Sequence, residues 1–97
     1  MAIAVILEWA VGDDGVSEDM YWKMTDKLGL RDRLPEGCSH HVAAFDPQQG
    51  GILSEVWDSP EAFGRFTQER QAPVAQELGL AAPTRVTVMP LIRALSA

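Results

Sequence analysis

The feature that most constrains this chain is an N-terminal segment that is apolar on both faces of a predicted strand. Residues 2–9 (AIAVILEW) are rich in apolar and β-branched side chains and contain no turn-forming residue. Because successive strand side chains point to opposite faces, alternate residues from Ile3 to Leu7 fill one face, and Ala4 and Ile6 fill the other. A strand of this kind is usually buried on both sides, so the fold must cover both faces of its sheet.

Turn signals and apolar periodicity divide the rest of the chain into further strands and helices. A serine N-cap followed by acidic residues opens each helix, and a glycine closes it. Pro73 lacks the N–H that would bond to residue 69, so the second helix should kink or restart there. The predicted elements are a strand over 2–9, a helix between Ser17 and Gly29, strands over 38–45 and 52–57 joined by a loop over 46–51, a helix between Ser59 and Gly79, and a strand over 84–89.

This order predicts an α+β, ferredoxin-like βαββαβ fold, with a four-stranded antiparallel sheet and both helices on one face. The chain has room for a single domain over residues 1–97. The open face would carry Ala4, Ile6, Leu53 and Trp57, a larger apolar patch than soluble monomers usually expose. We therefore expect a homodimer in which the open faces bury roughly 800 Å² per partner.

The charge balance argues against several classes of partner. Fourteen acidic and eight basic residues give a net charge of -6, and the Lys and Arg residues are spread along the chain. No basic patch can neutralise phosphates, so we expect no nucleic-acid and no membrane partner. The single cysteine, Cys38, forms no intrachain disulfide, and the N-terminal apolar run is too short and wrongly flanked for a signal peptide or membrane span. These features predict a cytoplasmic protein.

Residues 56–63 (VWDSPEAF), followed by Phe66, Arg70, Pro73 and residues 78–79, resemble the strand-to-helix signature of the dimeric α+β barrel superfamily. Within it, the chain is similar to small antibiotic biosynthesis monooxygenase-like proteins. The resemblance covers about half of the chain, from the third predicted strand through the second helix. It implies a dimeric α+β barrel.

The resemblance also implies a small-molecule function. The superfamily includes cofactor-free oxygenases, polyketide cyclases, isomerases, haem proteins and stress-response proteins, and fold alone does not choose among them. We expect an aromatic or polyketide-like ligand and no cofactor, with cofactor-independent oxygenation, cyclisation or isomerisation as the reaction. The alternative is a non-catalytic ligand-binding or stress-responsive dimer. The chain contains no Asn, one of the residues that the oxygenases use, and its histidines lie on a predicted strand, unlike the helical haem ligand of the haem-degrading branch.

The two histidines are the candidate catalytic residues. His40 and His41 are adjacent on a predicted strand and should point to opposite faces, with Cys38 beside His40 and Ser39 beside His41. Same-face neighbours lie about 6.6–7 Å apart, which is long for a thiolate–imidazole bond. No spacing supplies the further ligands of a zinc site, so we predict no metal. One histidine would line a pocket as an acid or base; the alternative is a histidine bonded to the backbone or placed at the dimer seam.

Aromatic side chains at strand ends and on helix stripes are the candidate ligand contacts, although such stripes also form plain cores. Arg70 could reach a ligand carboxylate or phenolate, or could instead cap a helix end. The candidate ligand-binding residues are Trp9, Tyr21, Met24, Trp57, Phe66 and Arg70, with Phe63 beside them.

Two carboxylates interrupt apolar strands. Glu8 and Glu55 lie on strands that neighbour one another in the predicted order, so they could be close, and burial would raise the pKa of one of them. The favoured alternative places each near a sheet end in water or paired with Arg85 across the dimer.

Overall fold

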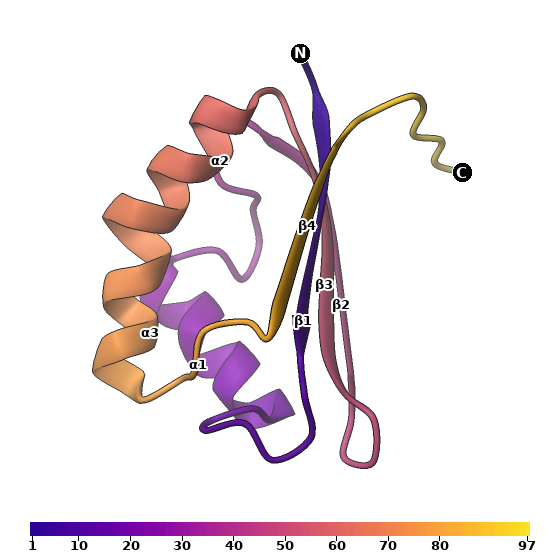
Figure 1. Cartoon of the computed structure of the whole chain (residues 1–97). Coiled ribbons are helices and arrows are strands. Elements are labelled where there is room, and N and C mark those ends of the chain that lie inside the picture. Colours follow the sequence, from indigo (N-terminus) through magenta and orange to yellow (C-terminus); the bar gives the residue numbers. More distant parts are fainter.

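A computed structural model describes all residues 1–97 and contains a four-stranded antiparallel sheet with every helix on one face (Figure 1). The sheet order is β2-β3-β1-β4. This is the predicted ferredoxin-like α+β fold. The elements are β1 (Ile3–Trp9), α1 (Glu18–Leu28), β2 (Cys38–Asp46), β3 (Gly50–Trp57), α2 (Pro60–Phe66), a π-helical turn (Thr67–Gln71), α3 (Ala72–Leu78) and β4 (Arg85–Pro90).

The helix termini form as the sequence predicts. The Ser17 hydroxyl accepts a hydrogen bond from the Met20 amide at 3.0 Å, and Ser59 accepts one from the Ala62 amide at 3.1 Å. Each satisfies an amide that the first helical turn leaves unpaired. Gly29 ends α1 with a φ of 73°, a conformation that favours glycine. None of the helices is both long and apolar enough to span a membrane.

The second helical segment restarts near Pro73, as expected, through a π-helical turn. The amide of Ala72 bonds to the carbonyl of Thr67, five residues earlier. Pro73 then occupies the first turn of α3, where a missing N–H costs nothing. The turn joins α2 and α3 into one nearly continuous rod over the sheet (Figure 1). Turns of this type are often found at functional sites.

The β2–β3 hairpin is tighter than the sequence predicts. The strands extend to Asp46 and begin again at Gly50, so only residues 47–49 connect them. The predicted loop over 46–51 is too long, because Gly50 and Gly51 are typical turn residues but belong to β3 here. Gly51 instead pairs with Trp9 of β1 and Phe45 of β2.

The core lies between the sheet and the helices. It contains alternate residues of β1 together with Cys38 and Trp57, and Val5 and Trp57 are completely buried. The prediction that Leu53 and Trp57 lie on the open face is wrong. Register decides their face, because Leu53 pairs with Leu7 and Trp57 pairs with Ile3, both on the helix-covered side.

The open face is nevertheless largely apolar. Ala4 and Ile6 lie there, as predicted. The most exposed of their large apolar neighbours are Val42, Ile52 and Met89, with 47%, 39% and 59% of their surfaces exposed.

Candidate functional site

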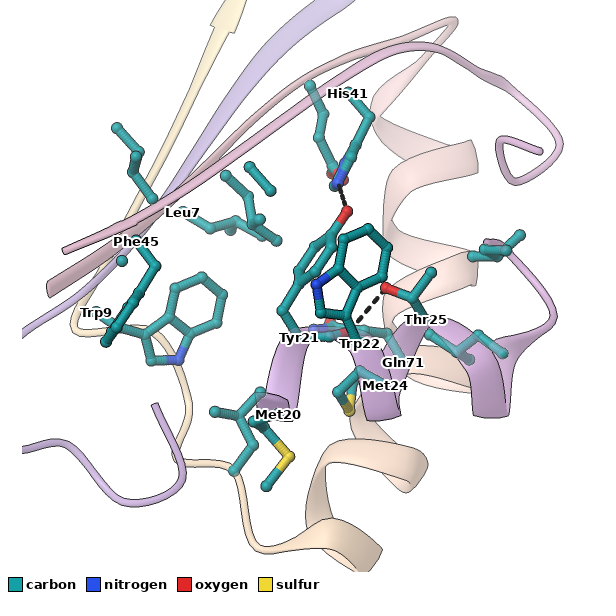
Figure 2. Close-up of a pocket in the computed structure, with 18 of the residues that line it drawn as sticks. Leu7, Trp9, Met20, Tyr21, Trp22, Met24, Thr25, His41, Phe45 and Gln71 are labelled. Atoms are coloured by element: carbon teal, nitrogen blue, oxygen red, sulfur yellow. Dashed lines mark hydrogen bonds and ion pairs between the residues drawn. The ribbon is translucent and has the colours of Figure 1, made fainter. Parts of the chain in front are cut away.

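A cavity of about 320 Å³ lies between α1, the inner face of the sheet and the π-helical turn (Figure 2). Most of its lining residues are hydrophobic. Seven of the residues singled out from the sequence lie in its wall: Trp9, Tyr21, Met24, His41, Glu55, Phe63 and Phe66. A mostly apolar cavity with a few polar groups is the usual form of a small-molecule site.

Three other candidates lie outside the cavity wall. Trp57 is fully buried behind it, with its ring centroid 5.7 Å from that of Phe63 and 5.4 Å from that of Phe66. Arg70 donates a 2.7 Å hydrogen bond to the carbonyl of Leu28, so it caps the end of α1. His40 points to the open face of the sheet, opposite to His41.

A β-bulge changes the predicted neighbours of the histidines. Between Cys38 and His40 the register shifts, so Cys38 pairs with Trp57 while His40 pairs with Val56. The prediction that Cys38 and His40 share a face is therefore wrong, because the extra bulge residue breaks the two-residue alternation. Cys38 is buried in the core, and burial raises the pKa of its thiol. A protonated thiol is a poor nucleophile.

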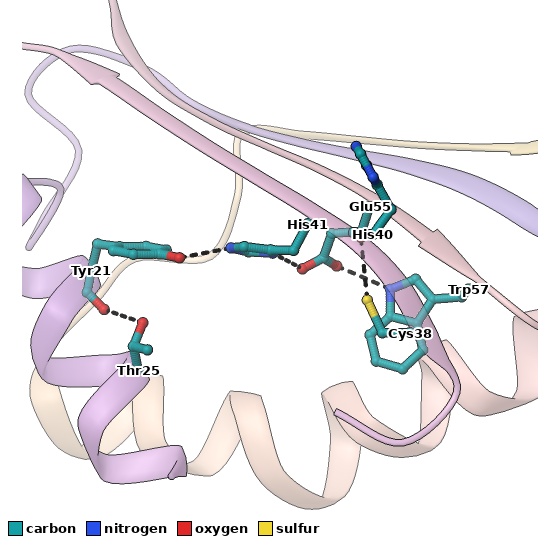
Figure 3. Close-up of polar contacts among 7 residues, drawn as sticks. All are labelled: Tyr21, Thr25, Cys38, His40, His41, Glu55 and Trp57. Atoms are coloured by element: carbon teal, nitrogen blue, oxygen red, sulfur yellow. Dashed lines mark hydrogen bonds and ion pairs between the residues drawn. The ribbon is translucent and has the colours of Figure 1, made fainter. Parts of the chain in front are cut away.

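The main polar feature of the cavity is a row of hydrogen-bonded side chains that we call the Tyr21 relay, formed by Tyr21, His41, Glu55 and Trp57 (Figure 3). The Tyr21 hydroxyl lies 2.8 Å from Nε2 of His41, and Nδ1 of His41 lies 2.7 Å from Oε2 of Glu55. The indole N–H of Trp57 donates to Oε1 of Glu55 at 3.0 Å. The relay joins α1, β2 and β3, and the first three members line the cavity.

The partners assign the protons of the relay. Glu55 is 91% buried, accepts the indole N–H of Trp57 at Oε1, and places Oε2 at 2.7 Å from Nδ1 of His41. An ionised carboxylate can only accept hydrogen bonds. His41 therefore carries a proton on Nδ1, and its neutral form accepts at Nε2 the proton that Tyr21 donates. Burial, and then the negative charge of Glu55, raise the pKa of Tyr21, so its hydroxyl stays protonated.

Sequence reasoning misplaced Glu55. Glu55 pairs with Val5 on the inner face, whereas Glu8 pairs with Ile52 on the open face, so the two carboxylates do not meet. Glu8 instead lies 3.8 Å from Arg85 of the same chain. A signal for the role of Glu55 was present, because it is a lone acid in an apolar strand that pairs with the histidine strand.

Two polar residues opposite α1 were not among the predicted site residues. Thr67 and Gln71, the first and last residues of the π-helical turn, both line the cavity. The one signal for them was Pro73, since a proline inside a helical pattern marks the place where the backbone must depart from α geometry. No group of three or more His, Cys, Asp or Glu side chains comes together in a way that could hold a metal ion.

No family model and no curated protein sequence matches the chain. Solved structures match its fold. An antibiotic biosynthesis monooxygenase-like protein from Chloroflexus aurantiacus is 17% identical with a TM-score of 0.65, over 99% of this chain and 98% of that one. Rv0793 from Mycobacterium tuberculosis is 16% identical with a TM-score of 0.67, over 99% and 100%. A second antibiotic biosynthesis monooxygenase-like protein, from Deinococcus radiodurans, is 17% identical with a TM-score of 0.55, over 100% and 98%.

These matches extend the resemblance from the half of the chain that carries the sequence signature to its whole length. At these identities the likeness concerns the backbone arrangement. Over its full length the chain has the fold of the antibiotic biosynthesis monooxygenase-like proteins.

Proposed function

We propose that this protein binds a flat aromatic or polyketide-like small molecule in the cavity beside α1, and that His41 acts there as an acid–base group without a cofactor. The observation that carries the proposal is an imidazole, backed by a buried carboxylate, in the wall of a mostly apolar cavity. The cavity volume of about 320 Å³ falls at the lower end of the range for ligand sites, roughly 300–1,000 Å³.

The walls suit a flat, unsaturated ligand. Trp9 and Phe45 lie at one end of the cavity, and Tyr21 and Trp22 lie nearer its middle (Figure 2). Aromatic rings stack on or meet the edges of such ligands. Proton transfer from a bound ligand is a common first step in oxygenation, cyclisation and isomerisation, and a positioned histidine typically accelerates such a step by about 10²–10⁴-fold.

A non-catalytic binding dimer is the alternative, and it would leave the polar residues to serve the subunit interface. His41 does not fit that role, because its ring nitrogens bond to Tyr21 and Glu55 of its own chain on the helix-covered side of the sheet. These contacts favour the acid–base proposal.

The first test is a titration with hydroxylated anthraquinones, followed by quenching of tryptophan fluorescence and by assay for turnover. We expect saturable quenching. Trp9 lies in the cavity wall, so a bound ligand would be close enough to quench its fluorescence. His41→Gln should lower turnover by about 10²-fold or more while changing affinity only a few-fold. His40→Gln is the matched control, since the neighbouring imidazole lies on the other face, and it should change neither quantity. Absence of binding across the panel would contradict the proposal.

The second part of the proposal is a homodimer formed through the open face. Ile6 lies at the centre of that face, and a second copy would cover the exposed side chains of Val42, Ile52 and Met89. Ile6→Arg should convert the dimer to a monomer, because an unpaired charge would be buried at the interface. Sedimentation should report half the mass. Val86→Arg is the control, since Val86 pairs with Leu7 on the opposite face, and it should stay dimeric.

A further inference from the structure

The Tyr21 relay leaves His41 without a nitrogen that is free to meet a ligand. An imidazole has two ring nitrogens, and here Nδ1 bonds to Glu55 at 2.7 Å and Nε2 bonds to Tyr21 at 2.8 Å. A ligand that approached His41 directly would have to displace Tyr21. The Tyr21 ring is packed edge-to-face with Trp22, at a centroid separation of 5.0 Å, and stacked with His41 at 5.9 Å.

Tyr21, in contrast, retains hydrogen-bonding capacity. A phenolic oxygen has one proton to donate and two lone pairs that can accept, and its bond to neutral His41 uses the proton. The ring projects from α1 toward the sheet within the cavity, and its oxygen lies at the His41 end (Figure 2). The unused lone pairs make this oxygen an acceptor for a ligand that carries a donor.

We propose that the ligand contacts the phenolic oxygen of Tyr21 rather than the imidazole, and that its proton reaches His41 through Tyr21. This inference rests on the proposed small-molecule function. The ligand would donate an O–H or N–H hydrogen bond to Tyr21. Its proton moves to the Tyr21 oxygen as the original phenolic proton moves to Nε2 of His41. The products are a ligand anion, a neutral Tyr21 and an imidazolium, so charge and protons balance.

The same geometry stabilises both ends of this transfer. Before it, the ligand donates to Tyr21 and Tyr21 donates to His41; afterwards, His41 donates to Tyr21 and Tyr21 donates to the ligand anion. Every bond keeps its two heavy atoms and only its direction reverses. The imidazolium then faces the Glu55 carboxylate at 2.7 Å, a buried partner of opposite charge.

Trp57 is a positioning residue in this scheme. Its indole N–H holds Oε1 of Glu55, which leaves Oε2 for His41. This contact fixes the carboxylate and thereby fixes the His41 tautomer that can accept the phenolic proton. Trp57 acts on the ligand only through Glu55, His41 and Tyr21.

The test compares 2-hydroxyanthraquinone with 2-methoxyanthraquinone, which differ by the donor hydrogen. Ionisation of the hydroxyl shifts the visible absorption of the first compound to longer wavelength, so proton transfer is observed directly. With the wild-type protein we expect the hydroxyl compound to bind about 10-fold more tightly and to show the shift. Tyr21→Phe removes only one oxygen, and it should abolish the shift and equalise the two affinities.

The outcomes separate this inference from the proposed function. If neither compound binds, the proposed function fails. Two results would show that the ligand does not use Tyr21: equal binding of both compounds to the wild type without a shift, or a shift that persists in Tyr21→Phe. Either result overturns this inference and leaves the proposed function standing. Thermal unfolding of Tyr21→Phe, measured beside the wild type, shows whether this variant has a folding defect. If it has one, ¹⁵N NMR of the His41 ring in the wild type is the second test of the relay.

The ¹⁵N shifts of the His41 ring test the relay without any ligand. In the wild type we expect the Nδ1–H tautomer when the ring is neutral, because Glu55 accepts at that nitrogen. Trp57→Phe should increase the fraction of the other tautomer, and Glu55→Gln should do so more strongly. A wild-type ring protonated on Nε2, or a tautomer that neither substitution changes, would contradict the relay.

Discussion

Replacing Trp57 with alanine should lower the free energy of unfolding by about 3–5 kcal/mol. Trp57 is completely buried and packs against Phe63 and Phe66, so its removal leaves a large cavity between the sheet and α2. It also leaves Oε1 of Glu55 without its donor. Domains of this size have about 5–15 kcal/mol of stability in total, so this loss is a large fraction of it.

Urea denaturation followed by far-ultraviolet circular dichroism measures this effect at a fixed protein concentration, because dimerisation would make stability concentration-dependent. Trp22→Ala is the matched control. Trp22 is 38% exposed and stacks beneath the Arg31 guanidinium, so its loss should cost at most about 1 kcal/mol. Equal losses for the two variants would contradict the central place of Trp57 in the core.

Gly50→Ala should destabilise the protein by about 2–3 kcal/mol, although it adds a single methyl group. Gly50 has a φ of +106°, which L side chains rarely adopt, and its new Cβ would overlap the carbonyl oxygen of Trp9. The backbone of the hairpin or of β1 would have to move. Because β2 and β3 carry His41 and Glu55, affinity for the anthraquinone probes should fall as well.

Gly64→Ala is the control for this substitution, and its expected sign is opposite. Gly64 lies inside α2 with no atom near the position of a new Cβ, so alanine should raise stability by about 0.5–1 kcal/mol. Both variants are compared by thermal and urea unfolding. Destabilisation by both, or by neither, would mean that backbone conformation at Gly50 is not the cause.

The site is assembled from elements that are distant in the chain. Tyr21 comes from α1, His41 from β2, and Glu55 with Trp57 from β3 (Figure 3). Antiparallel pairing of β2 with β3 and packing of α1 on the sheet bring them together. The aromatic and aliphatic wall was partly predictable, since Trp9, Tyr21, Met24 and Phe66 were selected from strand ends and helix stripes. The relay was not predictable, because side-chain contacts between strands depend on strand register. A slip of one residue moves every side chain of a strand to the other face.

Local signals in the sequence determined the secondary structure and its order: serine caps, glycine ends, a proline restart and a first strand that is apolar on both faces. These signals act over a few residues, so they can be read from the chain directly. Strand register and the bulge after Cys38 decided the rest. They determine which histidine faces the cavity, which carboxylate is buried and which face carries Trp57. Those features depend on pairing between distant segments, whose energy is set by packing of the whole sheet against its helices and not by any local pattern.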